Sequence, residues 1–384
     1  MQQPEQVPLW RNVRIIRLAG QGLILVVVIT VIVYLGSNLI ANFQRLNLTF
    51  GFDFLSRSSS FGIANPPIAY RPTDPYLRAL LVGLLNSLRV MFFGIIIAVV
   101  LGISVGISRL SDNWLVRKLA GVYVEILRNT PLLLQLFFWY FAVFLRLPKI
   151  ERPLVIGDKI FLTNRGLDIP WFAATFPTWF SLGAIVACIL IAVIAWMQRN
   201  REIERGQNPR LWVWLLGISA IAVVLLFLFG IEWIAPQLQN NSIRGGLNLS
   251  PEFATILIGL GIYTSAFIAE VVRAGIQSVS LGQWEAARAL GLKPSAMMQL
   301  VIFPQALRVM IPPLTSEFLN LAKNSSLAIA IGYSDIYAVG STISNQTGKS
   351  LEILAIVMAV YLIINLIVSW VMNRFNSLVQ LKER

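Results

Sequence analysis

Residues 80–107 read LLVGLLNSLRVMFFGIIIAVVLGISVGI, an apolar run in which Arg89 is the only charged side chain. A helix needs about 20 such residues to cross the hydrocarbon core of a bilayer. A transmembrane β-strand would instead alternate apolar and polar positions over about 10 residues. Because the run is continuous, it predicts a membrane-spanning helix.

Further runs of the same kind extend along the chain. The composition agrees, because 57% of the residues are hydrophobic, only 13% are charged and the mean hydropathy is +0.72, which excludes an ordinary soluble domain. The sequence therefore predicts an all-α fold, a polytopic membrane helix bundle of about eight transmembrane helices. The other predicted helices cover residues 18–40, 132–147, 172–197, 211–229, 253–276, 307–321 and 351–371.

The distribution of basic residues predicts the orientation in the membrane. The first run follows Arg11, Arg14 and Arg17 and is too long for the core of a signal peptide, so we keep it as a helix. Cytoplasmic segments carry an excess of Lys and Arg. Applied to the 31 Lys and Arg residues of the chain, this rule places both termini on the cytoplasmic side.

Several chemistries are excluded by what the sequence lacks. Cys188 is the single cysteine and there is no histidine, so neither an intrachain disulfide nor a His/Cys metal site can form. The G-x-x-x-x-G-K-[ST] phosphate loop is also missing. We therefore expect no enzyme, no metal and no cofactor, and any ATP hydrolysis has to occur on a separate subunit. We attribute the net charge of +13 to topology and membrane lipid rather than to nucleic acid.

A polar segment between two apolar runs reads Glu285-Ala-Ala-Arg-Ala-Leu-Gly291 and is followed by Val301-Ile-Phe-Pro304. The first part predicts a short helix over 284–290. Gly291 permits the left-handed conformation that ends a helix. Pro294 is well placed in the first turn of a second helical segment.

This pattern resembles the EAA loop of ABC importer permeases. In that family the loop forms a short cytoplasmic helix-turn-helix that docks in a groove of the ATP-hydrolysing subunit. The resemblance implies that Glu285, Ala286, Ala287, Gly291 and Pro304 couple the chain to an ATPase. We expect both alanines on the docking face, with Glu285 as an anchor at the tip.

Four further patterns resemble the polar amino-acid class of these permeases, in particular the larger permeases of general or acidic and neutral polar L-amino-acid uptake systems. The resemblance implies a type I ABC importer permease fold in a bacterial inner membrane. It also implies several partners: ABC ATPase subunits acting as a dimer, a periplasmic substrate-binding protein, a polar amino acid and a second permease subunit. An unequal pair of permeases, a heterodimer, is favoured over two copies of this chain. The patterns are GLLNSLR at 83–89, EILRNTP at 125–131, YTSAFIAEVVRAG at 263–275 and NLAKNSS at 320–326.

The chain is predicted to have two parts. Residues 1–78 hold an N-terminal transmembrane helix and a long periplasmic loop, and residues 79–384 form the permease core. Within the core, the coupling loop covers about 281–304. An inserted helix pair at about 149–250 is missing from the short members of the class.

Substrate contacts are sought among polar residues inside apolar runs, because such residues usually face a bundle interior or a wet cavity. An amino acid needs a donor cluster for its carboxylate and an acceptor cluster for its ammonium. Arg89 and Glu317 could supply these, although helix contacts or snorkelling explain some of the candidates equally well. The candidate substrate residues are Asn86, Arg89, Glu317, Asn320, Lys323 and Asn324.

Two other polar patterns are assigned structural roles. Glu270 and Arg273 are three residues apart near the end of one predicted helix, and we expect a local ion pair. Arg128 precedes Thr130-Pro131, which indicates a helix start with Thr130 as its cap. The resemblance does not mark this motif as substrate-binding.

Two alternatives stay open at this point. An ion-coupled or passive amino-acid carrier or channel would show inverted repeats or matching discontinuous helices, and no clear repeat is found. A membrane sensor or scaffold subunit would keep the loop and use it for signalling. Substrate-stimulated ATPase activity would distinguish an importer from both.

Overall fold

The computed structural model describes residues 13–45, 50–204, 209–239 and 242–379. The chain divides into two compact units, Met1–Leu55 and Ser56–Arg384, and each is described by itself. Residues 56–75 were expected to belong to the N-terminal part. By their contacts they belong instead to the second unit.

The first unit consists mainly of helix α1 (Val13–Arg45). Its residues 17–42 are long and apolar enough to cross a membrane, and none of that window is buried within the chain. Large apolar side chains such as Leu23 and Ile32 are more than 60% exposed. The apolar surface of this helix therefore has to be covered by lipid or by protein.

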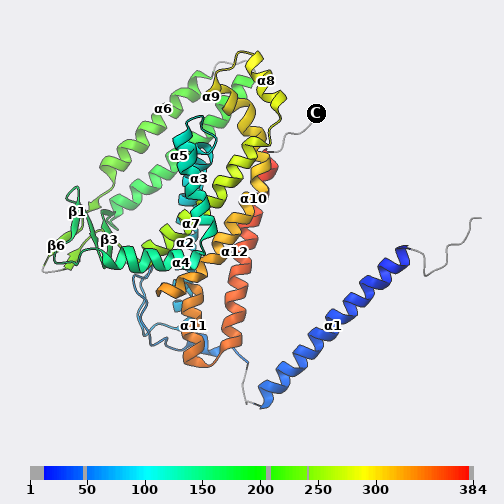
Figure 1. Cartoon of the computed structure of the whole chain (residues 1–384). Coiled ribbons are helices and arrows are strands. Elements are labelled where there is room, and N and C mark those ends of the chain that lie inside the picture. Colours follow the sequence, from blue (N-terminus) through cyan, green and yellow to red (C-terminus); the bar gives the residue numbers. More distant parts are fainter. Residues whose placement is uncertain (1–12, 46–49, 205–208, 240–241, 380–384) are drawn as a thin grey trace, which may run out of the picture. The chain divides into compact units, whose positions relative to one another are not determined.

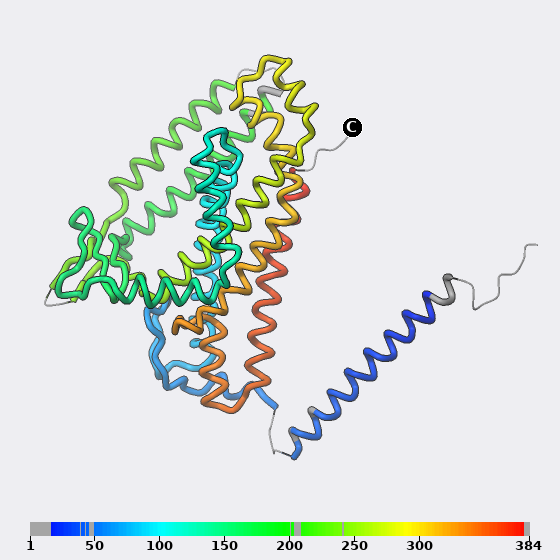
Figure 2. Tube along the Cα trace, in the orientation of Figure 1, coloured from blue at the N-terminus to red at the C-terminus, as the bar shows by residue number. Residues whose placement is uncertain are grey.

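The second unit contains the remaining long helices, which confirms the predicted membrane bundle (Figure 1). Among the described residues the whole chain has seven helices able to span a membrane, or up to eight if one bent pair is a single span. Helices α10 and α12 run side by side, as the orange and red tubes in Figure 2 show. The long helices of this bundle are α2 (Tyr76–Ser108), α7 (Pro251–Gln277), α10 (Phe303–Asn324) and α12 (Ser350–Val379).

Helices α2 and α7 form the most extensive contact between two elements of the described chain. Glycines allow this close approach. A Cβ atom at Gly102 would lie 2.5 Å from a methyl carbon of Ile268, and one at Gly106 would lie 2.8 Å from the carbonyl oxygen of Ala269. Small residues at such interfaces let two membrane helices pack backbone against backbone.

The third predicted span is not a straight helix. Helix α3 (Trp114–Asn129) and the segment 132–146 pass the length and apolarity test together but meet at an angle of 105°. The predicted helix over 132–147 is present as the helical segment 132–146, and the bend lies just before it. Only α4 (Leu132–Phe137) is α-helical, followed by a π-helix, η3 (Phe138–Val143), and a 3-10 turn, η4 (Phe144–Arg146).

Pro131 explains the break between α3 and α4. It lacks the N–H group that a continuing helix requires and restricts the residue before it. Thr130 is the C-cap of α3 rather than the cap of the next helix, so that prediction was wrong. The side chain of Gln135 donates to the carbonyl oxygens of Leu127 (2.9 Å) and Thr130 (3.0 Å), which satisfies backbone groups left free at the break.

The inserted region contains the two expected helices, α5 (Phe176–Glu204) and α6 (Arg210–Leu225), which continues into the π-helix η5 (Leu226–Gly230). These helices pack chiefly on each other. Short strands gather at the end of the hairpin that lies away from α8 and α9 (Figure 1). The sequence analysis missed these strands, because segments of two to four residues leave almost no periodic signal.

The strands form three antiparallel sheets. The largest has the order β1-β2-β3-β8, and β4 pairs with β5 and β6 with β7. In the largest sheet Leu162 lies opposite both Leu154 and Leu167. The strands are β1 (Leu154–Ile156), β2 (Ile160–Thr163), β3 (Gly166–Ile169), β4 (Trp171–Phe172), β5 (Trp233–Ile234), β6 (Gln237–Gln239), β7 (Ser242–Arg244) and β8 (Leu247–Leu249).

Candidate coupling loop and translocation face

The predicted loop forms two helical segments at one end of the bundle, α8 (Leu281–Ala289) and α9 (Pro294–Met297), whereas α11 (Ile336–Thr347) lies at the opposite end (Figure 1). Gly291 separates the segments with φ +69°. Only glycine adopts this left-handed conformation without steric cost. Pro294 occupies the first turn of α9 and Pro304 the first turn of α10, as helix N-termini favour.

The exposed surface of α8 carries only part of the predicted docking face. Glu285 and Ala286 are exposed. Ala287 is 2% exposed and packs in the hydrophobic core with Met297 and Ile302. The expectation that both alanines lie on the docking face was therefore wrong for Ala287, because its side of α8 is needed to attach the loop to the bundle.

A second contact joins the loop to α10. The side-chain amide of Gln305 donates to the side-chain oxygen of Gln283 at 3.0 Å. Between α9 and α10 the chain forms a π-helix, η6 (Met298–Ile302), whose Ile302 is fully buried. The loop is thus held to the bundle both by apolar packing and by a polar contact.

The expected ion pair between Glu270 and Arg273 is confirmed, and it is part of a larger group. Glu270 accepts hydrogen bonds from Arg273 of the same helix and from Arg109, the C-cap of α2. Arg273 also donates to the side chain of Gln277. The sequence analysis missed Arg109, because no local spacing relates it to a residue 161 positions away.

We predict that Glu270→Gln lowers the free energy of unfolding by about 2 kcal/mol, because two guanidinium groups then lose their shared, partly buried anion. Thermal unfolding of the detergent-purified complex, followed by tryptophan fluorescence, measures this loss. Glu125→Gln is the matched control, since Glu125 lies exposed on α3. Equal midpoints for the two variants would show that the Arg109–Glu270–Arg273 group does not stabilise the α2–α7 contact.

Asn86 and Arg89 are both engaged within the chain. The amide nitrogen of Asn86 donates to the carbonyl oxygen of Ser334 at 2.7 Å. The guanidinium of Arg89 lies 4.5 Å from the ring centroid of Phe253 and donates to the hydroxyl of Tyr333 at 2.9 Å. These two candidates therefore connect α2 to the segment that precedes α11.

The other substrate candidates lie near the C-terminal end of α10. Glu317 and Asn324 are half-buried, whereas Asn320 and Lys323 are exposed. Glu317 hydrogen-bonds Asn320 and interacts electrostatically with Arg128 of α3. Glu317 and Asn320 thus lie together on α10, while Asn86 and Arg89 form a separate group around Tyr333.

Helix α7 supplies an aromatic wall beside Arg128. The guanidinium carbon of Arg128 lies 5.2 Å from the ring centroid of Phe267, and the rings of Phe267 and Tyr263 are 5.0 Å apart. Phe267 and Tyr263 belong to the middle of α7, so this aromatic wall is part of a helix long and apolar enough to span a membrane.

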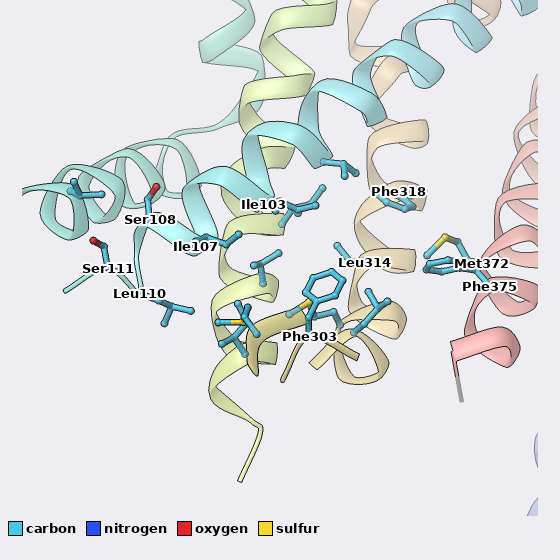
Figure 3. A pocket seen from close by; sticks show the side chains of 18 residues that line it. Ile103, Ile107, Ser108, Leu110, Ser111, Phe303, Leu314, Phe318, Met372 and Phe375 are labelled. Atoms are coloured by element: carbon cyan, nitrogen blue, oxygen red, sulfur yellow. The ribbon is translucent and has the colours of Figure 1, made fainter. Parts of the chain in front are cut away.

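A separate cavity of about 630 Å³ lies between the loop-side ends of α2, α7, α10 and α12. Its lining is almost entirely apolar, with Ile103, Leu314, Phe318 and Met372 around it (Figure 3). Such a surface offers nothing to a carboxylate or an ammonium group. The cavity is therefore suited to apolar groups rather than to a zwitterion.

No group of three or more His, Cys, Asp or Glu side chains that could hold a metal ion occurs in the part of the chain that the structure describes. Cys188 is a free thiol on α5.

Comparison with known proteins places this arrangement in a family. Residues 209–380 match the family described as "Binding-protein-dependent transport system inner membrane component". YhdX of Escherichia coli (strain K12) is 45% identical, with 95% of this chain and 94% of that protein covered. The general L-amino acid transport system permease protein AapQ of Rhizobium johnstonii is 42% identical, with 95% and 92% covered. A solved crystal structure of an amino acid ABC transporter with histidines shows 23% identity and a TM-score of 0.47, with 79% of this chain and 94% of that chain covered.

The long apolar helices and the helical loop between α7 and α10 place the protein in the class of polytopic membrane proteins. Given relatives of this identity along nearly the whole chain, the protein belongs to the permease family of binding-protein-dependent ABC transport systems.

Proposed function

We propose that this permease takes up polar L-amino acids into the cell and that hydrolysis of ATP by a separate subunit drives the transport. The observation that carries the proposal is the full-length relationship to AapQ, a general L-amino acid permease. It is supported by the glutamate/glutamine/aspartate/asparagine permease BztB of Rhodobacter capsulatus, which is 38% identical over 398 residues. The membrane is the bacterial inner membrane, with both termini and α8 on the cytoplasmic side.

The coupling surface is the exposed side of α8. Glu285 and Ala286 contact the ATPase, while Ala287 and Pro304 fix the loop to the bundle and Gly291 sets the turn between its two segments. This division of roles follows from the burial of Ala287 and from the positive φ at Gly291. Glu285 is the residue of the set whose charge can pair with a cation or a helix N-terminus of another chain.

The second permease subunit faces the side of the bundle that exposes charge. Arg128 and Asn320 are exposed and Glu317 is half-buried, although all three lie in segments apolar enough to cross the membrane. Charged side chains inside a bilayer face a bundle interior or water rather than lipid tails. A partner permease, a paralogue rather than a copy of this chain, completes a wet pathway along this face.

Glu317 and Asn320 line that pathway, and Lys323 and Asn324 lie further along α10 toward its outer end. Asn86 and Arg89 do not line the pathway themselves. Their contacts hold the segment before α11 in place and so stabilise the surrounding bundle. A periplasmic binding protein delivers the amino acid to the outer end of the bundle, the end at which α11 lies (Figure 1).

Reconstituted transport tests the function. The chain, copurified with its partner permease, ATPase and binding protein, is placed in proteoliposomes, and uptake of a panel of labelled L-amino acids is measured with and without internal ATP. We expect uptake only with ATP and the binding protein. Uptake that persists without ATP and follows an ion gradient would show that the protein is an ion-coupled carrier and not an ATP-driven importer. ATPase activity that responds to amino acids without any uptake would indicate a sensor.

A further inference from the structure

The apolar cavity between α2, α7, α10 and α12 has a buried side and an exposed side. Helix α7 forms the buried side with Ile268, Val272 and Ile276. On the exposed side, Ile107 of α2 and Phe375 of α12 lie on opposite sides of the cavity (Figure 3) and are 53% and 43% exposed. Both belong to helices able to span a membrane. The cavity therefore faces an apolar surrounding within the membrane, where lipid chains can reach it.

The length of the cavity matches one leaflet of a bilayer. Its lining runs along α2 from Val99 to Ser108 and along α10 from Phe303 to Phe318. With a rise of about 1.5 Å per residue, these stretches are roughly 14 and 22 Å long. Half of a hydrocarbon core of about 30 Å is about 15 Å. An acyl chain that enters from the side of α8 and α9 can therefore lie along the cavity.

The polar groups of the site gather at one end of this lining. Among the described side chains that line the cavity, only Ser108 and Ser111 are polar, and both lie at the end of α2 that is on the side of α8. The guanidinium of Arg117, which is exposed at the start of α3, donates to the carbonyl oxygen of Ser111 at 2.8 Å.

The charge beside this end is positive. Arg117 belongs to none of the ion pairs in the described residues. Lys118 next to it is also exposed, and these two cations outweigh the exposed carboxylate of Asp112. A guanidinium has five N–H donors, so Arg117 keeps donors for a second acceptor while it holds Ser111. Phosphate oxygens are acceptors that arginine binds well.

We propose that this cavity binds one acyl chain of an anionic phospholipid from the leaflet on the side of α8 and α9, with the lipid phosphate at Arg117. The apolar lining takes the chain, and the cationic end selects an anionic head group. Met298 and Phe303, which adjoin the two ends of the link η6 between the loop and α10, also line the cavity. The bound chain therefore packs against the segment that joins the loop to the bundle.

Photo-crosslinking locates the chain. A phosphatidylglycerol with a diazirine at the end of one acyl chain is added to the permease complex in detergent, and mass spectrometry identifies the crosslinked peptides. We expect crosslinks to α10 around Leu314 and Phe318, at the end of the lining far from Arg117. The measurement needs neither ATP nor substrate, so its result does not depend on the proposed function.

Competition identifies the head group. Unlabelled phosphatidylglycerol is expected to displace the probe at about fivefold lower concentration than phosphatidylcholine with the same chains, because a single arginine near a membrane surface attracts an anionic lipid to about this extent. Glycerol phosphate, an anion without chains, is expected to leave the crosslinks unchanged. Arg117→Gln removes the difference between the two lipids, whereas the control Lys118→Gln, which changes the neighbouring exposed cation, retains it.

A variant that fills the cavity tests the place of the chain. Ile103→Trp is expected to lower the yield of crosslinks to α10 at least about tenfold, because each methylene group that is excluded weakens binding roughly fourfold. Ile96→Trp is the matched control, since Ile96 is an exposed isoleucine of the same helix outside the lining. It should leave the yield unchanged.

Three results would overturn the site. They are crosslinks confined to residues outside the cavity, equal displacement by phosphatidylglycerol and phosphatidylcholine, and displacement by glycerol phosphate alone. Size-exclusion chromatography checks that each variant complex is assembled. If Ile103→Trp does not assemble, the position of the crosslinks in the wild-type complex and the surface variant Arg117→Gln still decide the proposal.

Discussion

Reversal of the charge at Glu285 is expected to abolish ATP-driven uptake while leaving the permease folded. Glu285 is exposed on α8, so Glu285→Arg disturbs no packing within the chain. At the docking surface it places a cation where a cation or a helix N-terminus of the ATPase binds the carboxylate, and like charges at an interface cost several kcal/mol. An unfavourable change of about 3 kcal/mol lowers coupled uptake roughly 100-fold.

Uptake into proteoliposomes and ATP hydrolysis are measured on the same preparation. Asp112→Arg is the matched control, because it makes the same change of charge at an exposed position between α2 and α3, outside the loop. The control should transport at the wild-type rate. If Glu285→Arg also transports at the wild-type rate, α8 is not the coupling surface.

The second large effect is expected from Gly106→Val in α2. A Cβ atom at this position would lie 2.8 Å from the carbonyl oxygen of Ala269 and 2.8 Å from the Cβ of Val272. Neither neighbour can give way cheaply, since one is backbone and the other is β-branched. The helices must separate, and we expect the free energy of unfolding to fall by about 3 kcal/mol.

Thermal unfolding of the purified complex, followed by tryptophan fluorescence, measures this loss. Gly121→Val in α3 is the matched control, because an added Cβ there meets no atom within 4 Å. The Gly121→Val control changes helix propensity in the same way but creates no steric clash. A Gly106→Val midpoint no lower than that of the control would mean that α2 and α7 can separate without cost.

The coupling loop was the most predictable part of the candidate site. Glu285, Gly291 and Pro294 act through local conformation, since a helix end and a helix start depend on residues only a few positions away. The structure has α8, the positive φ at Gly291 and α9 at those positions. The burial of Ala287 was not predictable, because it depends on which side of α8 faces the bundle.

The substrate candidates show the opposite case. Asn86 and Arg89 share a helical face with spacing typical of a polar site, yet their partners are Ser334 and Tyr333, more than 240 positions away in the chain. Arg128 was assigned to a helix start, and only the tertiary structure places its guanidinium over the ring of Phe267 on α7. The spacing of residues within one helix carries no information about contact partners so far away in the chain.

The sequence by itself determined the membrane helix bundle and the position of the helical loop between α7 and α10. In lipid, a continuous apolar run can satisfy its own backbone hydrogen bonds only by forming a helix. Glycine at a helix end permits a local turn without help from distant residues. The tertiary structure decided the close α2–α7 contact, the contacts of Asn86 and Arg89 with Ser334 and Tyr333, and the sharing of Glu270 by Arg109 and Arg273. These features depend on how separate helices pack, and packing is fixed by the shapes of distant side chains rather than by local pattern.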